Sequence, residues 1–169
     1  MRMSADPPPP ENFLERIFRQ LSQNPGTTFL QEVSGGKGPS ATGGELLSLI
    51  TEAHTFLRTT HLKRGDRCAL HAANSLKWIA LDLAIMAEGL IAVPLYSRQA
   101  ASELVAMLRD CGPVLVISGD GTLRDAIAAE WPEHPRIVIV DEIFPEPAAP
   151  NLLTEPPAAL AANDPVTII

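Results

Sequence analysis

From residue 67 onward, short apolar runs alternate with stretches in which apolar residues recur every three or four positions. Runs of this length that are apolar throughout are typical of parallel strands covered on both faces, and the stretches between them have helical spacing. This alternation predicts an α/β fold: a doubly wound, mostly parallel sheet with helices on both faces. The predicted strands are Arg67–Ala73, Leu90–Leu95, Val114–Ser118 and Ile137–Val140. The predicted helices run from Asn74 or Ser75 to about Glu88, over Ala100–Asp110 and over Leu123–Glu130.

The first sixty residues add two more predicted helices. A stripe of apolar residues over Asn12–Leu21 predicts an amphipathic helix that ends before Asn24-Pro25-Gly26. Thr42 and Glu45 have the spacing of a capping box, so a second helix is expected to begin at Thr42. The segment between these helices predicts a short strand at Thr27–Val33 and a turn at Ser34–Ser40.

Both ends of the chain are expected to be irregular. Residues 1–10 finish in four consecutive prolines and predict a tail outside the folded domain. Residues 141–165 are rich in Pro, Ala and Glu, and predict a long connection over the surface. Val166–Ile169 then predicts a last strand.

The composition limits the classes of partner. Acidic residues outnumber basic ones by 20 to 13, a formal net charge of -7, whereas proteins that bind nucleic acids usually carry a basic face. We therefore expect no nucleic-acid partner. The longest apolar stretch contains Asp82, Glu88 and Pro94, so no transmembrane segment is expected. With no secretory signal visible, we predict a soluble cytoplasmic protein.

Two glycine-rich segments are candidate ligand loops. Residues 35–40 lack the spacing of a phosphate loop because Gly38 and Pro39 follow Lys37, so a turn between short strands is favoured. The segment Ser118–Thr122 lies between a predicted strand and a predicted helix, which is where ligands bind in α/β sheets. It lacks the dinucleotide-binding pattern, and we interpret it as a loop with weak ligand-binding potential.

The other reactive side chains form no nucleophile–base or acid pair. Four histidines have no metal-ligand spacing and are interpreted as partly exposed or hydrogen-bonded structural residues: His54, His61, His71 and His134. Three serines lack the nucleophile-elbow motif: Ser75, Ser97 and Ser118. Cys68 and Cys111 are interpreted as buried thiols. Asp82 is interpreted as part of a polar helix edge with Lys77 and Glu88, the alternative being a perturbed carboxylate.

Five short motifs follow one another between Thr42 and the end of the chain: Thr42–Leu46, Leu62–Leu70, Asn74–Trp78, Glu88–Tyr96 and Asn163–Ile169. In this order and spacing they resemble the N-terminal region of adenylate-forming (AMP-binding) enzymes. That superfamily contains acyl-CoA synthetases, luciferases and the adenylation domains of peptide synthetases. Gly43 stands where the family usually has an aromatic residue. The segment Val93–Ser97 is most like the long-chain fatty acyl-CoA synthetases.

The resemblance implies that residues 11–169 are a partial N-terminal α/β domain, truncated before the phosphate loop. The parent enzyme would use ATP and Mg to turn a carboxylic acid, with a fatty acid as the expected substrate, into an acyl-adenylate. It would then transfer the acyl group, in most members to CoA. Its partners would be the remainder of the parent chain, the acid, ATP and CoA. A homodimer formed through exposed apolar surface is a further expectation.

The motifs that hold the family's catalytic residues match no position of this chain. We therefore assign no catalytic, cofactor-binding or metal-binding residue and no cofactor to the fragment, and we expect it to be inactive alone. The alternative hypothesis is a self-contained flavodoxin-like α/β module that binds a small ligand or a protein.

Overall fold

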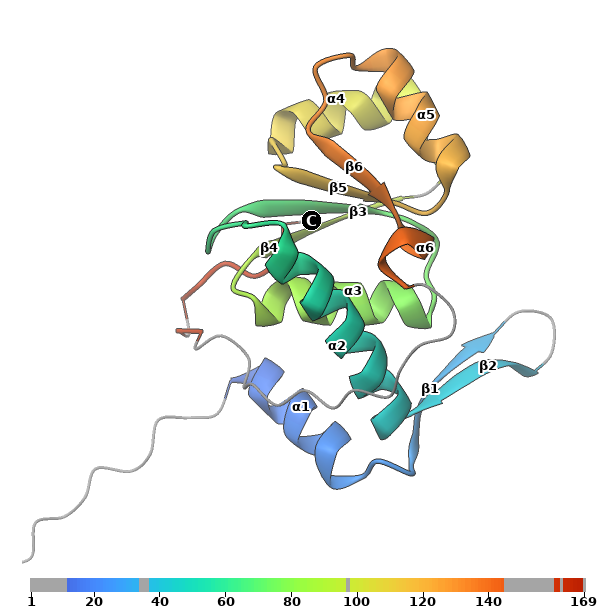
Figure 1. The fold of residues 1–169 in the computed structure, drawn as a ribbon, viewed down its shortest axis with the longest axis vertical. Helices are drawn as coiled ribbons and strands as arrows, with labels where there is room; N and C mark the ends of the chain where they lie inside the picture. Colours follow the sequence, from blue (N-terminus) through green and yellow to red (C-terminus); the bar gives the residue numbers. More distant parts are fainter. Residues whose placement is uncertain (1–11, 34–36, 97, 145–159, 162, 169) are drawn as a thin grey trace, which may run out of the picture.

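A four-stranded parallel sheet forms the centre of the computed structural model, which describes residues 12–33, 37–96, 98–144, 160–161 and 163–168. The strands lie in the order β4-β3-β5-β6, so β3 pairs with both β4 and β5 (Figure 1). Their bounds are β3 Arg67–His71, β4 Ile91–Leu95, β5 Leu115–Ser118 and β6 Arg136–Ile139. The connections after β3 and β5 lead in opposite directions along the sheet, which confirms the predicted doubly wound arrangement.

Helices cover both faces of the sheet, as predicted. Figure 1 shows α4 (Ala101–Cys111) and α5 (Gly121–Glu130) on one face, and α2 (Gly43–Thr59) and α3 (Leu76–Ala87) on the other. Because side chains alternate along a strand, Cys68 and Leu70 of β3 pack into the cluster with α2 and α3, whereas Ala69 packs into the cluster with α4 and α5. All three are fully buried. The sheet therefore separates two apolar cores.

A fifth helix, α1 (Phe13–Gln23), packs against α2 on the outside of this layer. Its N-terminus has a capping box in which Glu15 N–H donates to Asn12 Oδ1 at 2.9 Å and Asn12 N–H donates to Glu15 Oε2 at 3.1 Å. The apolar stripe is buried as predicted: Leu14, Phe18 and Leu21. None of the helices in the described part of the chain is long and apolar enough to cross a membrane.

The turn predicted at Ser34–Ser40 is wrong over its second half, because Lys37–Thr42 is a strand, β2, paired antiparallel with β1 (Thr28–Val33). Residues 34–36 lie outside the described residues. Gly38 makes the pairing possible, since a Cβ at this position would lie 2.3 Å from the carbonyl oxygen of Glu32. The glycine and proline of this segment suggested a turn in the sequence, but in the structure they belong to a closely paired strand.

The strand predicted at Val166–Ile169 is reduced to a single bridge between Thr167 and Ala92 of β4, in parallel orientation. Ala92 N–H donates to the carbonyl oxygen of Val166, and Ile168 N–H donates to the carbonyl oxygen of Ala92, both at 2.9 Å. Ile169 is outside the described residues. The bridge lies on the free side of β4, where Pro94 is tolerated because an edge strand has no second neighbour requiring its N–H.

The connection predicted for residues 141–165 begins with a short helix, α6 (Val140–Ile143), so the expectation of an irregular start was wrong. Val140, Ile143 and the following Phe144 are buried in the core beneath α2 and α3, which explains why the chain turns inward here. Residues 145–159 and 162 are not among the described residues. The other helices and strands begin and end within two residues of the predicted limits.

The predicted start of α2 is confirmed by a capping box between Thr42 and Glu45. Thr42 N–H donates to Glu45 Oε2 at 2.8 Å, and Glu45 N–H donates to Thr42 Oγ1 at 3.3 Å. At the next position, a Cβ on Gly43 would lie 2.6 Å from the carbonyl oxygen of Leu21 and 2.7 Å from that of Asn24. The end of α1 therefore excludes a side chain at Gly43.

We predict that Gly43→Ala destabilises the chain by about 1–3 kcal/mol, because α1 must move away from α2 to admit the methyl group. Alanine is otherwise the better helix residue, so intrinsic propensity alone predicts the opposite sign. Urea unfolding followed by circular dichroism measures the change. Gly26→Ala is the matched control, since no atom lies within 4 Å of a Cβ there. Equal stability of the two variants would contradict the steric explanation.

Candidate functional site

The βα loops at the carboxyl end of the sheet form the candidate site, because ligands bind in open α/β sheets where neighbouring connections diverge. The loop after β3 ends at Ser75, whose side chain accepts a hydrogen bond from Trp78 N–H at 3.1 Å and caps α3. The loop after β5 ends at Asp120, which caps α5 by accepting from Leu123 N–H at 2.9 Å. Both caps fix the direction in which the chain leaves the sheet.

The loops after β3 and β5 are in close contact. Gly119 N–H donates to the carbonyl oxygen of His71 at 2.9 Å, and a Cβ on Gly119 would lie 3.3 Å from the Cα atom of Ala72. This contact closes the crevice at the point of divergence. The open space lies instead on the other side of β3, between the loops that follow β3 and β4.

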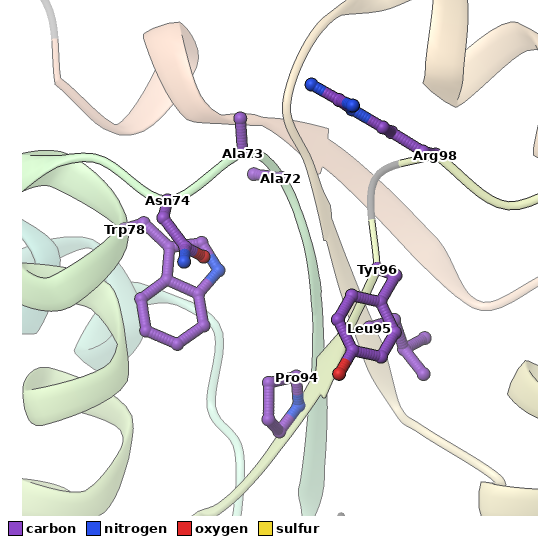
Figure 2. Close-up of a pocket in the computed structure, with 8 residues that line it drawn as sticks. All are labelled: Ala72, Ala73, Asn74, Trp78, Pro94, Leu95, Tyr96 and Arg98. Carbon is purple, nitrogen blue, oxygen red and sulfur yellow. The ribbon is translucent and has the colours of Figure 1, made fainter. Parts of the chain in front are cut away.

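That space is a cavity of about 460 Å³ (Figure 2). Asn74 and Trp78 lie on the α3 side, and Pro94 and Tyr96 lie on the β4 side, with Arg98 at the mouth. Tyr96 is 81% exposed and Arg98 is exposed, so the phenol and the guanidinium remain accessible. The residues that line it are Ala72, Ala73, Asn74, Trp78, Pro94, Leu95, Tyr96 and Arg98.

The lining is mostly apolar, with one amide and one permanent positive charge. Cavities of this size and composition bind small molecules, and a guanidinium at the mouth favours a negatively charged or hydrogen-bond-accepting group. The sequence analysis named Asn74, Trp78 and Tyr96 only as parts of family-like motifs, and it assigned neither them nor Arg98 to a cavity, because it looked for catalytic motifs. Their positions directly after two predicted parallel strands were the signal that could have identified them.

The predicted ligand loops have structural roles in the described residues. In the segment Ser118–Thr122, the side chain of Asp120 caps a helix, and buried Ser118 donates to the carbonyl oxygen of Asp120 at 3.3 Å. Gly38 and Pro39 lie within β2, so the first glycine-rich segment is no phosphate loop. Ser75 is a helix cap, and Ser97 is outside the described residues.

The histidines are partly as predicted. His54 contacts Glu88, His61 is exposed with a φ of 58°, and Nδ1 of His134 lies 2.6 Å from the carbonyl oxygen of Pro135. The interpretation is wrong for His71. Its side chain is fully buried, and neither ring nitrogen has a hydrogen-bond partner within the described part of the chain.

Asp82 is closer to the perturbed carboxylate than to a solvated polar edge. Burial raises the pKa of Asp82, although its side chain is only half-buried. Lys77 pairs with Asp141 of α6 at 3.0 Å, and Glu88 pairs with His54 of α2, so the predicted polar edge is divided between two neighbouring helices. Asp82 lies on α3, the helix that also carries Trp78 of the cavity, but it is not among the residues that line the cavity.

The magnesium ion implied by the family resemblance finds no set of ligands in the residues described. No group of three His, Cys, Asp or Glu side chains converges there in a way that could hold a metal. The described residues also contain no glycine-rich phosphate loop at a helix N-terminus. We therefore derive no reaction step through a metal held by this part of the chain.

The chain matches the family model described as AMP-binding enzyme over residues 17–169. It belongs to this family. The match covers the parallel sheet, its helices on both faces and the carboxyl-end loops that line the cavity. The resemblance of the five sequence motifs to adenylate-forming enzymes is thereby confirmed.

Individual known proteins are similar to this chain over most of its length. The long-chain-fatty-acid–CoA ligase FadD15 of Mycobacterium bovis is 26% identical over 172 residues, which cover 94% of this chain and 29% of the relative. The N-terminal domain of FACL13 from Mycobacterium tuberculosis superposes with a TM-score of 0.75 at 25% identity, covering 94% of this chain and 41% of that one. VinN in complex with L-aspartate gives a TM-score of 0.77 at 18% identity, over 92% and 43% of the two chains, and shares the fold. The chain thus spans less than a third of the curated relative's length.

The two cysteines are free thiols with different burial. Cys68 is fully buried, as predicted, and burial, together with the charge of Asp66, raises the pKa of its thiol to about 12. Cys111 is only half-buried, and burial raises the pKa of its thiol as well. Because the thiolate is the reactive form, both thiols are weak nucleophiles at neutral pH.

We predict that iodoacetamide at pH 8 leaves Cys68 unmodified in the folded chain and modifies Cys111 slowly. Mass spectrometry of the Cys111→Ser variant isolates Cys68, which is expected to react only after guanidinium is added. Cys68→Ser is the matched control. Rapid native labelling of Cys68 would show that α2 and α3 do not enclose their face of β3.

Proposed function

We propose that this chain is the N-terminal part of an ATP-dependent ligase that activates a carboxylic acid, with a long-chain fatty acid as substrate. The acid carboxylate attacks the α-phosphorus of ATP, which gives an acyl-adenylate and releases pyrophosphate. The thiol of CoA then attacks the acyl carbon, which gives an acyl-CoA thioester and releases AMP. The observation that carries the proposal is the family match over residues 17–169. Support for a fatty acid comes from the name of the relative FadD15.

The described residues would serve this reaction as scaffold. The apolar cavity, with Arg98 at its mouth, lies at the carboxyl end of the sheet, which is the end where α/β enzymes bind their ligands. The bridge between Thr167 and Ala92 runs parallel to β4, so residues that continued it would pass toward the same end. A phosphate loop following that strand would therefore lie beside the β4 wall of the cavity.

Catalysis would require groups beyond these 169 residues. No nucleophile–base pair or carboxylate pair is assembled in the described residues, and the chain covers 29% of the length of FadD15. We expect the remainder of the parent chain to supply the phosphate loop and the ATP, Mg and CoA contacts. We also expect the protein to work in the cytoplasm, where ATP and CoA are available.

The proposal includes a homodimer formed through exposed apolar surface. The large exposed apolar side chains come from separate elements, among them Phe13 of α1, Val33 of β1, Met107 of α4 and Val114 before β5. The oligomeric state of the purified chain, measured by sedimentation, tests whether a dimer forms.

We predict that the 169-residue chain alone catalyses no carboxylate-dependent exchange of pyrophosphate into ATP. The full product of the reading frame that encodes it is expected to do so, with palmitate preferred over acetate. Reactions without acid, and with the long-chain alcohol in place of the acid, are the controls. Exchange by the 169 residues would contradict the scaffold role.

Absence of exchange from the full product with every acid would contradict the proposed ligase activity. Saturable ligand binding by the chain alone would then favour the flavodoxin-like module. A preference for acetate would contradict the fatty-acid substrate.

A further inference from the structure

His71 is the last residue of β3, the strand that is paired on both sides. It lies opposite Leu95 of β4 and Ser118 of β5, and its exposed fraction is 0%. Nδ1 and Nε2 are both buried and have no partner at hydrogen-bond distance and angle within the described residues, although the Tyr96 backbone lies close enough to favour a proton on the ring. Buried polar side chains nearly always have partners, and an unpaired one costs stability even when it is uncharged. This residue therefore needs a physical explanation.

The surroundings of the imidazole are apolar on the side of the covering helices, and Ser118 of β5 is the buried polar residue opposite it in the sheet. Alternation along β3 places His71 on the same face as Ala69, in the layer covered by α4 and α5. The helix side chains buried in this layer are Leu104, Val105, Leu108 and Ile127. An imidazolium formed here would have no solvent and no ion-pair partner on the covering faces of the two helices.

The charged side chains around this layer are at least partly exposed to solvent. Arg98, at the mouth of the cavity, is exposed, and the charged side chains of α4 and α5 are exposed or half-exposed: Glu103, Arg109, Asp110, Arg124, Asp125 and Glu130. Arg124 is paired with Asp125 and Glu142. Asp120, in the loop after β5, is the carboxylate whose charge favours a proton on His71. One carboxylate at the rim offsets only part of the cost of burying a cation.

His71 also lies directly beneath the cavity at the carboxyl end of the sheet. The three residues that follow it, Ala72, Ala73 and Asn74, form one wall, and its strand partner Leu95 belongs to the other. Its carbonyl oxygen accepts the hydrogen bond from Gly119 that closes the adjacent crevice. Movement of His71 therefore displaces both βα loops at once.

We propose that His71 is an acid-sensitive switch: its protonation expels the imidazole from the layer beneath α4 and α5 and opens the carboxyl end of the sheet. Neither the family match nor the proposed ligase activity requires such a switch. The proposal depends on the burial of the ring, on its unpartnered nitrogens and on its position under the cavity.

The direction of the pH dependence follows from the electrostatics. Burial lowers the pKa of His71, while the Tyr96 backbone and the Asp120 charge offset part of this effect. The folded state thus favours the neutral ring, whereas an unfolded or open state takes up a proton near pH 6.5. The stability contributed by the neutral ring is complete above that pH and is lost as the pH falls below it.

Direct titration of the histidine rings by NMR tests the proposal on the unaltered 169-residue chain. The His71 ring is expected to take up its proton only below the pH at which an unperturbed imidazole does, about 6.5, and to lose its folded-state signal as it becomes charged. Titration of His71 at or above that reference pH, with no change in the folded signals, would overturn the proposal.

Unfolding in urea at pH 7 and pH 5 provides the second test. If His71 stays neutral when folded, the unfolding equilibrium constant of the unaltered chain should rise up to about 25-fold more between these pH values than that of His71→Leu. His71→Asn, which also cannot titrate, serves if the leucine does not fit. His61→Asn is the control and should retain the full pH dependence. Equal pH dependence in the unaltered chain and both His71 variants would overturn the proposal.

Tryptophan fluorescence can distinguish local opening from global unfolding. Trp131 packs against the cluster beneath α4 and α5, so a Trp78→Phe background leaves one emitter that reports on this layer. Its emission is expected to shift at a higher pH than the loss of circular dichroism signal, and this shift should disappear in His71→Leu. Coincident transitions that are unaffected by the His71 substitution would contradict local opening.

Discussion

The backbone hydrogen bonds that join β3 to both β4 and β5 govern the arrangement of this protein. A strand paired on both sides can expose neither edge, and its two faces must each be covered by apolar groups. Helices α2 and α3 cover one face, and α4 and α5 cover the other. Because β3 is central, its carboxyl end brings together the loops that lead to both layers. The cavity and the buried His71 are consequences of that position.

The two helical layers differ in where their polar and charged side chains lie. Between α2, α3 and α6, charged side chains reach across helices: Lys77 pairs with Asp141, and His54 contacts Glu88. Burial also raises the pKa of Glu52 on α2 and of Asp82 on α3. A carboxyl group whose pKa is raised in the folded state makes folding more favourable as the pH falls, because its buried charge is neutralised. Protonation of His71 on the other side of the sheet makes folding less favourable. Acid therefore stabilises one layer and destabilises the other.

Within the AMP-binding family, the described part of this chain contributes a scaffold and the wall of a cavity. The described residues build a sheet, cover it and shape a cavity with Trp78, Tyr96 and Arg98, but they gather no reactive pair. Gly43 stands where the sequence resemblance led us to expect an aromatic residue, and packing explains the glycine. The carbonyl oxygens of Leu21 and Asn24 occupy the space that a side chain would need. The position is constrained by how α1 crosses α2.

Local sequence signals determined most of the fold. Continuous apolar runs marked the parallel strands, helical spacing marked the helices between them, and the pair Thr42 and Glu45 marked the start of α2, because these signals act over a few residues. Tertiary contacts decided the rest. Residues 37–42 became a strand because Gly38 lets it approach β1, and Val140–Ile143 turned inward because the core accepts its apolar side chains. Nothing in the sequence distinguishes His71 from the other histidines. Its buried, unpartnered state depends on strands and helices that are distant along the chain, so only the folded structure could reveal it.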